Sequence, residues 1–187
     1  QTNAVLYILD PKNADLADLS SVLPKCAQPQ RGDRAVYHRF LHGYARTQCG
    51  YERMENYKTG ENYAYLGLSP HFLVFDEYVA FMEMLTSRER EDVLNKLRQI
   101  VMLGRQAGFF LILACQRPDA KYLGDGIRDQ FNFRVALGRM SELGYSMMFG
   151  ETKKGVLFQR ISRAEVMPIP ERGVITEFYT PIVPKGV

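Results

Sequence analysis

A run of four apolar residues followed directly by two carboxylates constrains the fold of this chain more than any other feature. The run, Phe72-Leu73-Val74-Phe75, is short, continuous and rich in Phe and Val, which predicts a strand buried on both faces, as in a parallel sheet. Asp76 and Glu77 follow it. Ligands of such sheets bind beyond the carboxyl ends of the strands, so these carboxylates would emerge at a binding edge. A strand that simply ends in an acidic turn is the alternative, and it accounts for most such runs.

The composition is that of one ordinary globular domain, and we expect a single domain over residues 1–187. Hydrophobic residues make up 46% and charged residues 24%, and the net charge of +3 permits a nucleic-acid partner without arguing for one. No apolar run approaches the ~18 residues of a membrane span. Three cysteines without a CxxC pair predict free thiols in the cytoplasm, and the three histidines are too scattered to predict a zinc site.

Strands and helices alternate along the chain. Residues 4–9 and 109–114 are further apolar strand candidates, and residues 35–54 have a helical period. Thr86 and Glu89 have the spacing of a capping box that opens a helix to about residue 106. We therefore expect a three-layer α/β domain with a mainly parallel sheet. Later strands are expected at residues 133–137, 156–158 and 174–178, and residues 24–34 are expected to form a loop.

Two of the predicted strands end in polar groups, Asp76-Glu77 and Gln116-Arg117. In a parallel sheet these ends fall on the same edge. Asp76 could organise Mg²⁺ there while Glu77 polarises a water, which is the chemistry of a Walker B strand. The Gln116 amide can both donate and accept, so it can link a phosphate to that water. Taken alone, Gln116 is more simply a strand cap and Arg117 a solvated side chain.

Several short motifs occur in the order seen in one family. They resemble those of the FtsK/SpoIIIE-type DNA translocases of the HerA/FtsK superfamily, and the later ones look like those of the conjugation coupling ATPases of Gram-positive integrative and conjugative elements. The match covers nearly the whole chain. The motifs are Asp10-Pro11-Lys12, Leu73-Val74-Phe75-Asp76-Glu77, Gly104-Arg105-Gln106-Ala107-Gly108, Leu113-Ala114-Cys115-Gln116-Arg117-Pro118, Phe133-Arg134-Val135-Ala136-Leu137-Gly138-Arg139 and Glu177-Phe178-Tyr179-Thr180-Pro181.

The resemblance implies a RecA-like P-loop NTPase core that binds ATP and Mg²⁺ and assembles as a ring, usually a hexamer, around DNA. Asp76 would then organise Mg²⁺ through water, Glu77 would activate the attacking water, and Gln116 would be the sensor on the neighbouring strand. Arg105 matches the arginine proposed in this superfamily as a finger that reaches the nucleotide of the next subunit. From the residues alone, Arg105 is only a surface arginine on a helix.

One expected motif is absent from the sequence. A phosphate loop needs G-x-x-x-x-G-K-[ST], and residues 150–155 come nearest without a lysine and a hydroxyl after their last glycine. In the family this loop precedes the first strand seen here. We therefore expect the chain to begin just downstream of it, as an incomplete core that has little or no ATPase activity alone, and the intact protein to be the ATPase.

Basic residues in predicted loops are the candidates for contact with the DNA backbone, which needs charge but no base-reading pattern. Most such groups only solvate a surface. The candidates are Arg117, Lys121, Arg128, Lys153 and Lys154.

A motor that pumps DNA is the leading hypothesis. The alternative is a non-hydrolysing RecA-like interaction module of a DNA-transfer or division complex, and a phosphate loop upstream in the gene would separate the two. A metal-dependent hydrolase is disfavoured because no histidine or further carboxylate cluster completes a site. Membrane anchors and membrane-embedded or relaxosome partners would lie outside these residues.

Overall fold

The computed structural model describes residues 3–12, 26–27, 33–116, 121–138, 141–150, 164–168 and 176–178. The chain divides into two compact units, residues 1–116 and residues 117–187. The expectation of a single domain over 1–187 stays a prediction.

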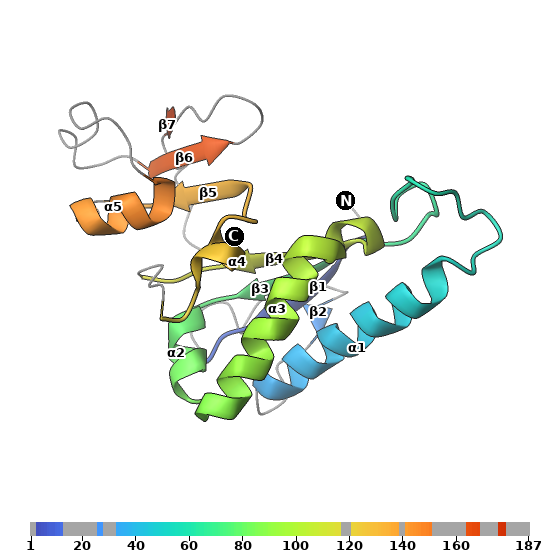
Figure 1. Ribbon diagram of the computed structural model, residues 1–187, viewed down its shortest axis with the longest axis horizontal. Coiled ribbons are helices and arrows are strands. Elements are labelled where there is room, and N and C mark those ends of the chain that lie inside the picture. Colours follow the sequence, from blue (N-terminus) through green and yellow to red (C-terminus); the bar gives the residue numbers. More distant parts are fainter. Residues whose placement is uncertain are drawn as a thin grey trace, which may run out of the picture. The chain divides into compact units, whose positions relative to one another are not determined.

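The first unit contains a four-stranded sheet in which every described pair of strands is parallel (Figure 1). Its order is β2-β1-β3-β4. The strands are β1 (Val5–Leu9), β2 (Cys26–Ala27), β3 (His71–Phe75) and β4 (Phe109–Leu113). The predicted parallel α/β architecture is therefore confirmed, with strands β1, β3 and β4 where the apolar runs placed them. Strand β2 lies in the predicted loop at residues 24–34, because two residues are too few to give a strand pattern.

Two long helices, α1 (Asp33–Tyr51) and α3 (Ser87–Ala107), lie side by side along the sheet, and the short α2 (Tyr78–Glu83) follows β3 (Figure 1). The predicted capping box opens α3: Glu89 N–H donates to the Thr86 hydroxyl, and the Glu89 carboxylate accepts the Thr86 N–H. Gly108 ends this helix with a positive φ of 80°, a conformation that glycine adopts without strain.

Aromatic rings fill the space between the helices and the sheet. The Phe109 ring lies 4.4 Å from the ring of His71, 5.4 Å from that of Phe40 and 5.5 Å from that of Tyr44. Phe40 in turn packs edge-on against Tyr7 at 5.3 Å. Each such pair adds about 0.5–1.5 kcal/mol to what the buried area contributes. This core packs α1 against one face of the sheet.

The prediction that β3 is buried on both faces is wrong. Leu73 and Phe75 are fully buried, whereas Phe72 and Val74, on the opposite face, are only half-buried. The reason is that α1 and α3 cover the same face. On the other face Phe72 stacks on Phe110 at 5.2 Å.

The second unit contains an antiparallel sheet with the order β5-β6-β7. Its strands are β5 (Phe133–Ala136), β6 (Ala164–Pro168) and β7 (Thr176–Phe178), and its helices are α4 (Asp125–Arg128) and α5 (Glu142–Phe149). The strand expected at 133–137 and the one expected at 174–178 are present, but they pair through β6 rather than joining the parallel sheet. Strand β6 was not predicted, and the one expected at 156–158 lies outside the described residues.

Packing around α5 holds part of this unit together. Tyr145 and Phe149 of α5 form a small buried cluster with Ala136 of β5. The Arg134 guanidinium donates to the carbonyls of Arg128, Phe131 and Met148.

None of the helices in the described ranges combines the length and the apolar character that crossing a bilayer requires.

The close approach of α3 to β4 gives a first prediction. A Cβ at Gly104 would lie 2.5 Å from the Phe109 carbonyl oxygen, so Gly104→Ala must push the helix away from the strand. We expect a loss of about 1–3 kcal/mol in the free energy of unfolding, measured by denaturant titration. Gly50→Ala is the control, because no atom lies within 4 Å of its Cβ position in α1. Equal stabilities of the two variants would contradict the prediction.

Candidate functional site

Three side chains from three strand ends meet at the carboxyl edge of the parallel sheet. Glu77 follows β3, and its Oε1 accepts hydrogen bonds from Lys12 Nζ at 2.8 Å and from Gln116 Nε2 at 3.3 Å. Lys12 lies beyond the end of β1, and Gln116 beyond the end of β4. The expectation that Glu77 and Gln116 lie on one edge is thus confirmed.

The backbone of Glu77 has a conformation that side-chain-bearing residues rarely adopt. Its φ of 47° and ψ of 46° are left-handed, and it is the only residue other than glycine with a positive φ in the described ranges. Such a residue costs about 1–3 kcal/mol and persists where its surroundings hold it. Two hydrogen bonds do so here: Glu77 N–H donates to Asp76 Oδ1, and Tyr78 N–H donates to the Ala114 carbonyl. The sharp turn places the carboxylate where Lys12 and Gln116 reach it.

The electrostatic surroundings keep Glu77 ionised. The hydrogen bond from Lys12 is the largest influence and lowers the pKa of the carboxyl, partial burial opposes it, and the hydrogen bond from Gln116 lowers the pKa further. At neutral pH Glu77 is therefore an anion that can accept a hydrogen bond from a water and polarise it. Its low pKa makes it a weak base, so such a carboxylate is suited to orienting and polarising a water rather than to taking its proton.

Asp76 lies where its carboxylate oxygens could accept hydrogen bonds from the waters around Mg²⁺. It is half-buried at the strand end, and its Oδ1 accepts the Glu77 N–H. Asp10, buried at the end of the adjacent β1, is a second carboxylate at this edge. No group of three or more possible metal ligands occurs among the described residues. Mg²⁺ commonly keeps its waters and uses one or two carboxylates together with substrate phosphates, so the residues at this edge fit that mode.

Cys115 directly precedes Gln116 at this edge. Burial raises the pKa of its thiol, and the nearby charge of Glu77 raises it further. The thiol is therefore protonated at neutral pH and is a poor nucleophile.

The structure does not bring Arg105 to these residues. Arg105 is exposed in the last turn of α3, which leads into the amino end of β4, whereas Gln116 follows the carboxyl end of that strand. Five strand residues separate the two ends by about 17 Å.

The predicted DNA-binding residues are only partly described. The Lys121 ammonium donates to the Tyr122 hydroxyl at 2.7 Å and lies 4.6 Å from the centre of that ring. Arg128 ends α4 and is half-buried. Both belong to the second unit. Arg117, Lys153 and Lys154 lie outside the described residues.

Lys12 is the site residue that sequence reasoning missed. It appeared in a motif after the first strand, but no role was assigned to it. A lysine within three residues of a predicted strand end, in a parallel sheet whose neighbouring strand ends in carboxylates, is a usable signal for such an ion pair.

The ion pair predicts how the Glu77 titration responds to Lys12. In Lys12→Met the pKa of Glu77 should rise toward its ordinary value, because the main influence that lowers it is gone. Side-chain carboxyl NMR of the glutamates measures this directly. In the wild type, ionised Glu77 stabilises the fold at pH values above the ordinary pKa of a glutamate. This stabilisation is lost as the pH falls through the lowered pKa of Glu77. The Lys12→Met protein should therefore lose less stability over that acidic range.

Lys96→Met is the matched control, because it removes the same charge from an exposed position on α3. An unchanged Glu77 titration in Lys12→Met, or an equal rise in the control, would show that the ion pair is not what lowers the pKa.

Known proteins resemble this chain over most of its length, although no family model matches it. It is 54% identical over 184 residues to the Ftsk domain-containing protein YdcQ of Bacillus subtilis (strain 168), a match that covers 98% of this chain and 38% of YdcQ. It is 26% identical over 151 residues to the DNA translocase FtsK of Halalkalibacterium halodurans, covering 73% of this chain and 19% of that protein. The chain thus spans about two fifths or less of these curated relatives.

Two solved structures share the fold. The conjugation coupling protein TcpA of pCW3, solved with ATPgS, superposes with a TM-score of 0.67 at 19% identity, over 88% of this chain and 49% of that one. The cytoplasmic domain of the type VII secretion ATPase EccC of Thermomonospora curvata gives a TM-score of 0.65 at 19% identity, over 99% and 23%. The first unit thus has the parallel α/β fold of P-loop ATPases. With the relatives in sequence and the ordered motifs, this places the chain in the FtsK/SpoIIIE-type family.

Proposed function

We propose that this chain forms part of an ATP-driven DNA translocase or coupling motor, and that it supplies the Walker B half of the ATP site. The observation that carries the proposal is the contact between Glu77 and Gln116 at the ends of adjacent parallel strands. The names of the relatives support the class of activity, since they include DNA translocases and a conjugation coupling protein. Transfer of conjugative DNA and pumping of a chromosome both fall within this class.

The side chains at this edge have separable roles. Glu77, held as an anion by Lys12, polarises the attacking water. Gln116 hydrogen-bonds to Glu77 and can turn its amide toward a γ-phosphate, which links the presence of that phosphate to the position of the carboxylate. Asp76 holds the waters around Mg²⁺, which neutralises charge on the phosphates.

The phosphates themselves need a second half of the site. This sequence contains no G-x-x-x-x-G-K-[ST] motif. We infer that the 187-residue chain alone hydrolyses little or no ATP, and that ATP and Mg²⁺ are used by the intact protein. Only this missing motif favours the alternative of a non-hydrolysing interaction module. ATP hydrolysis by the intact protein would distinguish a motor from such a module.

The place of Arg105 supports assembly of several copies. It lies at the amino end of β4, about a strand length from the Glu77 edge of its own subunit. As an arginine finger it would therefore complete the site of a neighbour, which favours a ring, with a hexamer as the expected size, around DNA. The same proposal includes a cytoplasmic location for these residues. Membrane anchoring and contacts with relaxosome partners would involve parts of the protein outside them.

The first test replaces Glu77. In the intact protein Glu77→Gln should keep nucleotide binding and lower the rate of ATP hydrolysis by a factor of about 10²–10⁴, the range typical of losing a positioned base. Nucleotide binding and steady-state hydrolysis are measured on the same preparation. Glu83→Gln, an exposed change at the end of α2, is the control. Wild-type turnover by the Glu77→Gln protein would contradict the proposed role.

The second test replaces Arg105. Assembled Arg105→Ala protein should lose hydrolysis by a factor of about 10³ or more, as arginine fingers do, while Arg98→Ala on the same helix should not. Mixing Arg105→Ala with Glu77→Gln subunits should restore part of the activity, because some interfaces then pair an intact arginine with an intact glutamate. If mixed rings assemble but recover no ATP hydrolysis, Arg105 does not act on the site of a neighbouring subunit.

A further inference from the structure

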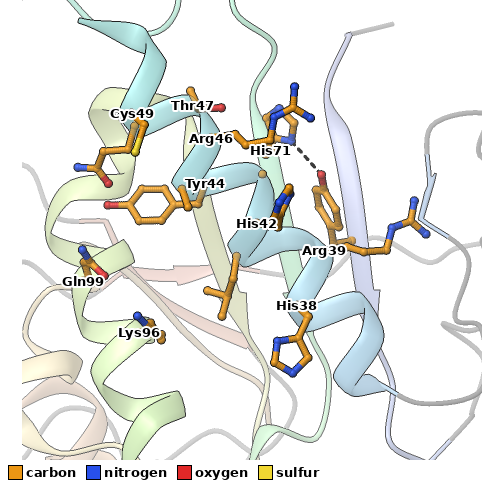
Figure 2. Close-up of a pocket in the computed structure, with 15 residues that line it drawn as sticks. His38, Arg39, His42, Tyr44, Arg46, Thr47, Cys49, His71, Lys96 and Gln99 are labelled. Atoms are coloured by element: carbon orange, nitrogen blue, oxygen red, sulfur yellow. Dashed lines mark hydrogen bonds between the residues drawn. The ribbon is translucent and has the colours of Figure 1, made fainter.

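A hollow of about 1190 Å³ lies along α1, and none of the residues at the carboxyl ends of the strands lines it (Figure 2). Its lining comes from α1, from the adjacent strands β1 and β3, and from α3. All three histidines of the sequence, His38, His42 and His71, line it, although they are scattered along the chain. None of the fifteen lining residues is acidic.

The basic side chains on one side of α1 form a stripe. Arg39, His42 and Arg46 are three and four residues apart, so they follow one another along the same side of the helix. All three are exposed, and neither arginine forms an ion pair with a described carboxylate. In Figure 2 the Arg46 side chain lies close to His71, which begins β3, whereas the Arg39 side chain extends away from it. We call Arg39, His42 and Arg46 the basic stripe.

Hydrogen-bonding groups form the floor beside the basic stripe. The Tyr7 hydroxyl and His71 Nδ1 are 3.3 Å apart, and the His71 ring is fixed by stacking on Phe109 at 4.4 Å. Burial raises the pKa of Tyr7, and the charge of Arg39 lowers it. Burial lowers the pKa of His71, so this ring is neutral and can hydrogen-bond to an anion without adding charge.

We propose that the basic stripe and its floor bind the phosphate backbone of DNA. The inference rests on the proposed function for the choice of DNA, and it adds a surface that no motif indicated. Lysine or arginine spaced along a helix holds phosphates without reading bases, as a motor that moves over any sequence requires.

The shape and composition of the hollow favour an extended polyanion over other ligands. Its volume exceeds the roughly 300–1,000 Å³ of pockets that enclose a small ligand. A membrane-binding helix would carry large apolar side chains in contact with the lipid, and none of the large exposed apolar residues belongs to α1. The surface therefore has the charge for phosphates and lacks an anchor for acyl chains.

Salt-dependent binding of DNA to the 187-residue chain tests the proposal. Fluorescence anisotropy of a labelled duplex, measured between about 50 and 200 mM salt, gives the slope of log K against log salt. The double variant Arg39→Gln/Arg46→Gln should weaken binding at least tenfold at the lowest salt, and its slope should be smaller by about two, because each lost phosphate contact accounts for about 0.9. Arg39→Lys/Arg46→Lys keeps both charges and should retain most of the binding.

Arg88→Gln/Arg98→Gln is the matched control, because it removes the same charge from exposed positions on α3 that do not line the hollow. If both double variants weaken DNA binding equally, the effect comes from net charge alone and the proposal is overturned. Wild-type affinity in Arg39→Gln/Arg46→Gln, or no binding of DNA by the wild-type chain, would overturn it too. None of these results affects the Glu77→Gln test, which reads hydrolysis in the intact protein.

Two further experiments test whether the surface binds DNA rather than another anion. Anionic phosphatidylglycerol vesicles should not bind the wild-type chain in a way that depends on Arg39 and Arg46. Binding to vesicles instead of DNA would assign the surface to a membrane and overturn the proposal. Inorganic phosphate should compete only at the concentrations at which other salts do. Displacement of DNA by micromolar phosphate would mark a small-anion site and would also overturn it.

Discussion

The hydrogen-bonded register of β1, β3 and β4 decides where the side chains of the candidate site lie. Leu9, Phe75 and Leu113 are neighbours in one row, so the three strands end together. The ladder continues beyond them, with Asp76 N–H donating to the Leu9 carbonyl and Ala114 N–H to that of Phe75, both at 2.9 Å. Glu77 therefore meets Lys12 and Gln116 across 65 and 39 residues of sequence. A slip of one residue in this register would turn these side chains to the other face.

The two edges of this sheet have different chemistry. The carboxyl edge carries an anion at a strained position, and hydrogen bonds on both sides hold the left-handed turn there: Glu77 N–H donates to the Asp76 carboxylate and Tyr78 N–H to the Ala114 carbonyl. The amino edge carries His71, which stacks on Phe109, and the last turn of α3, which contains Arg105. The aromatic core packs α1 against the strands.

Local signals in the sequence were reliable where the physical cause is local. The capping box at Thr86 and Glu89 and the glycine exit at Gly108 fixed both ends of α3, because each depends on hydrogen bonds within a few residues. Pairing between distant segments was predicted less well. Strands were expected near β5 and β7, but β6, which pairs with both of them, was missed, so the antiparallel sheet of the second unit was not predicted. Burial of β3 was overestimated because apolar residues alone do not tell which face a helix will cover.

The sequence by itself determined the class of chemistry. A buried strand that ends in Asp76-Glu77, a second that ends in Gln116, and ordered motifs specify the family, because strand ends, caps and turns depend on local composition. Only the tertiary structure decided which groups meet. It paired Lys12 with Glu77, placed Arg105 at the opposite edge, and gathered three scattered histidines beside two arginines. Distances between residues far apart in the chain are set by strand register and helix packing, which no short stretch of sequence contains.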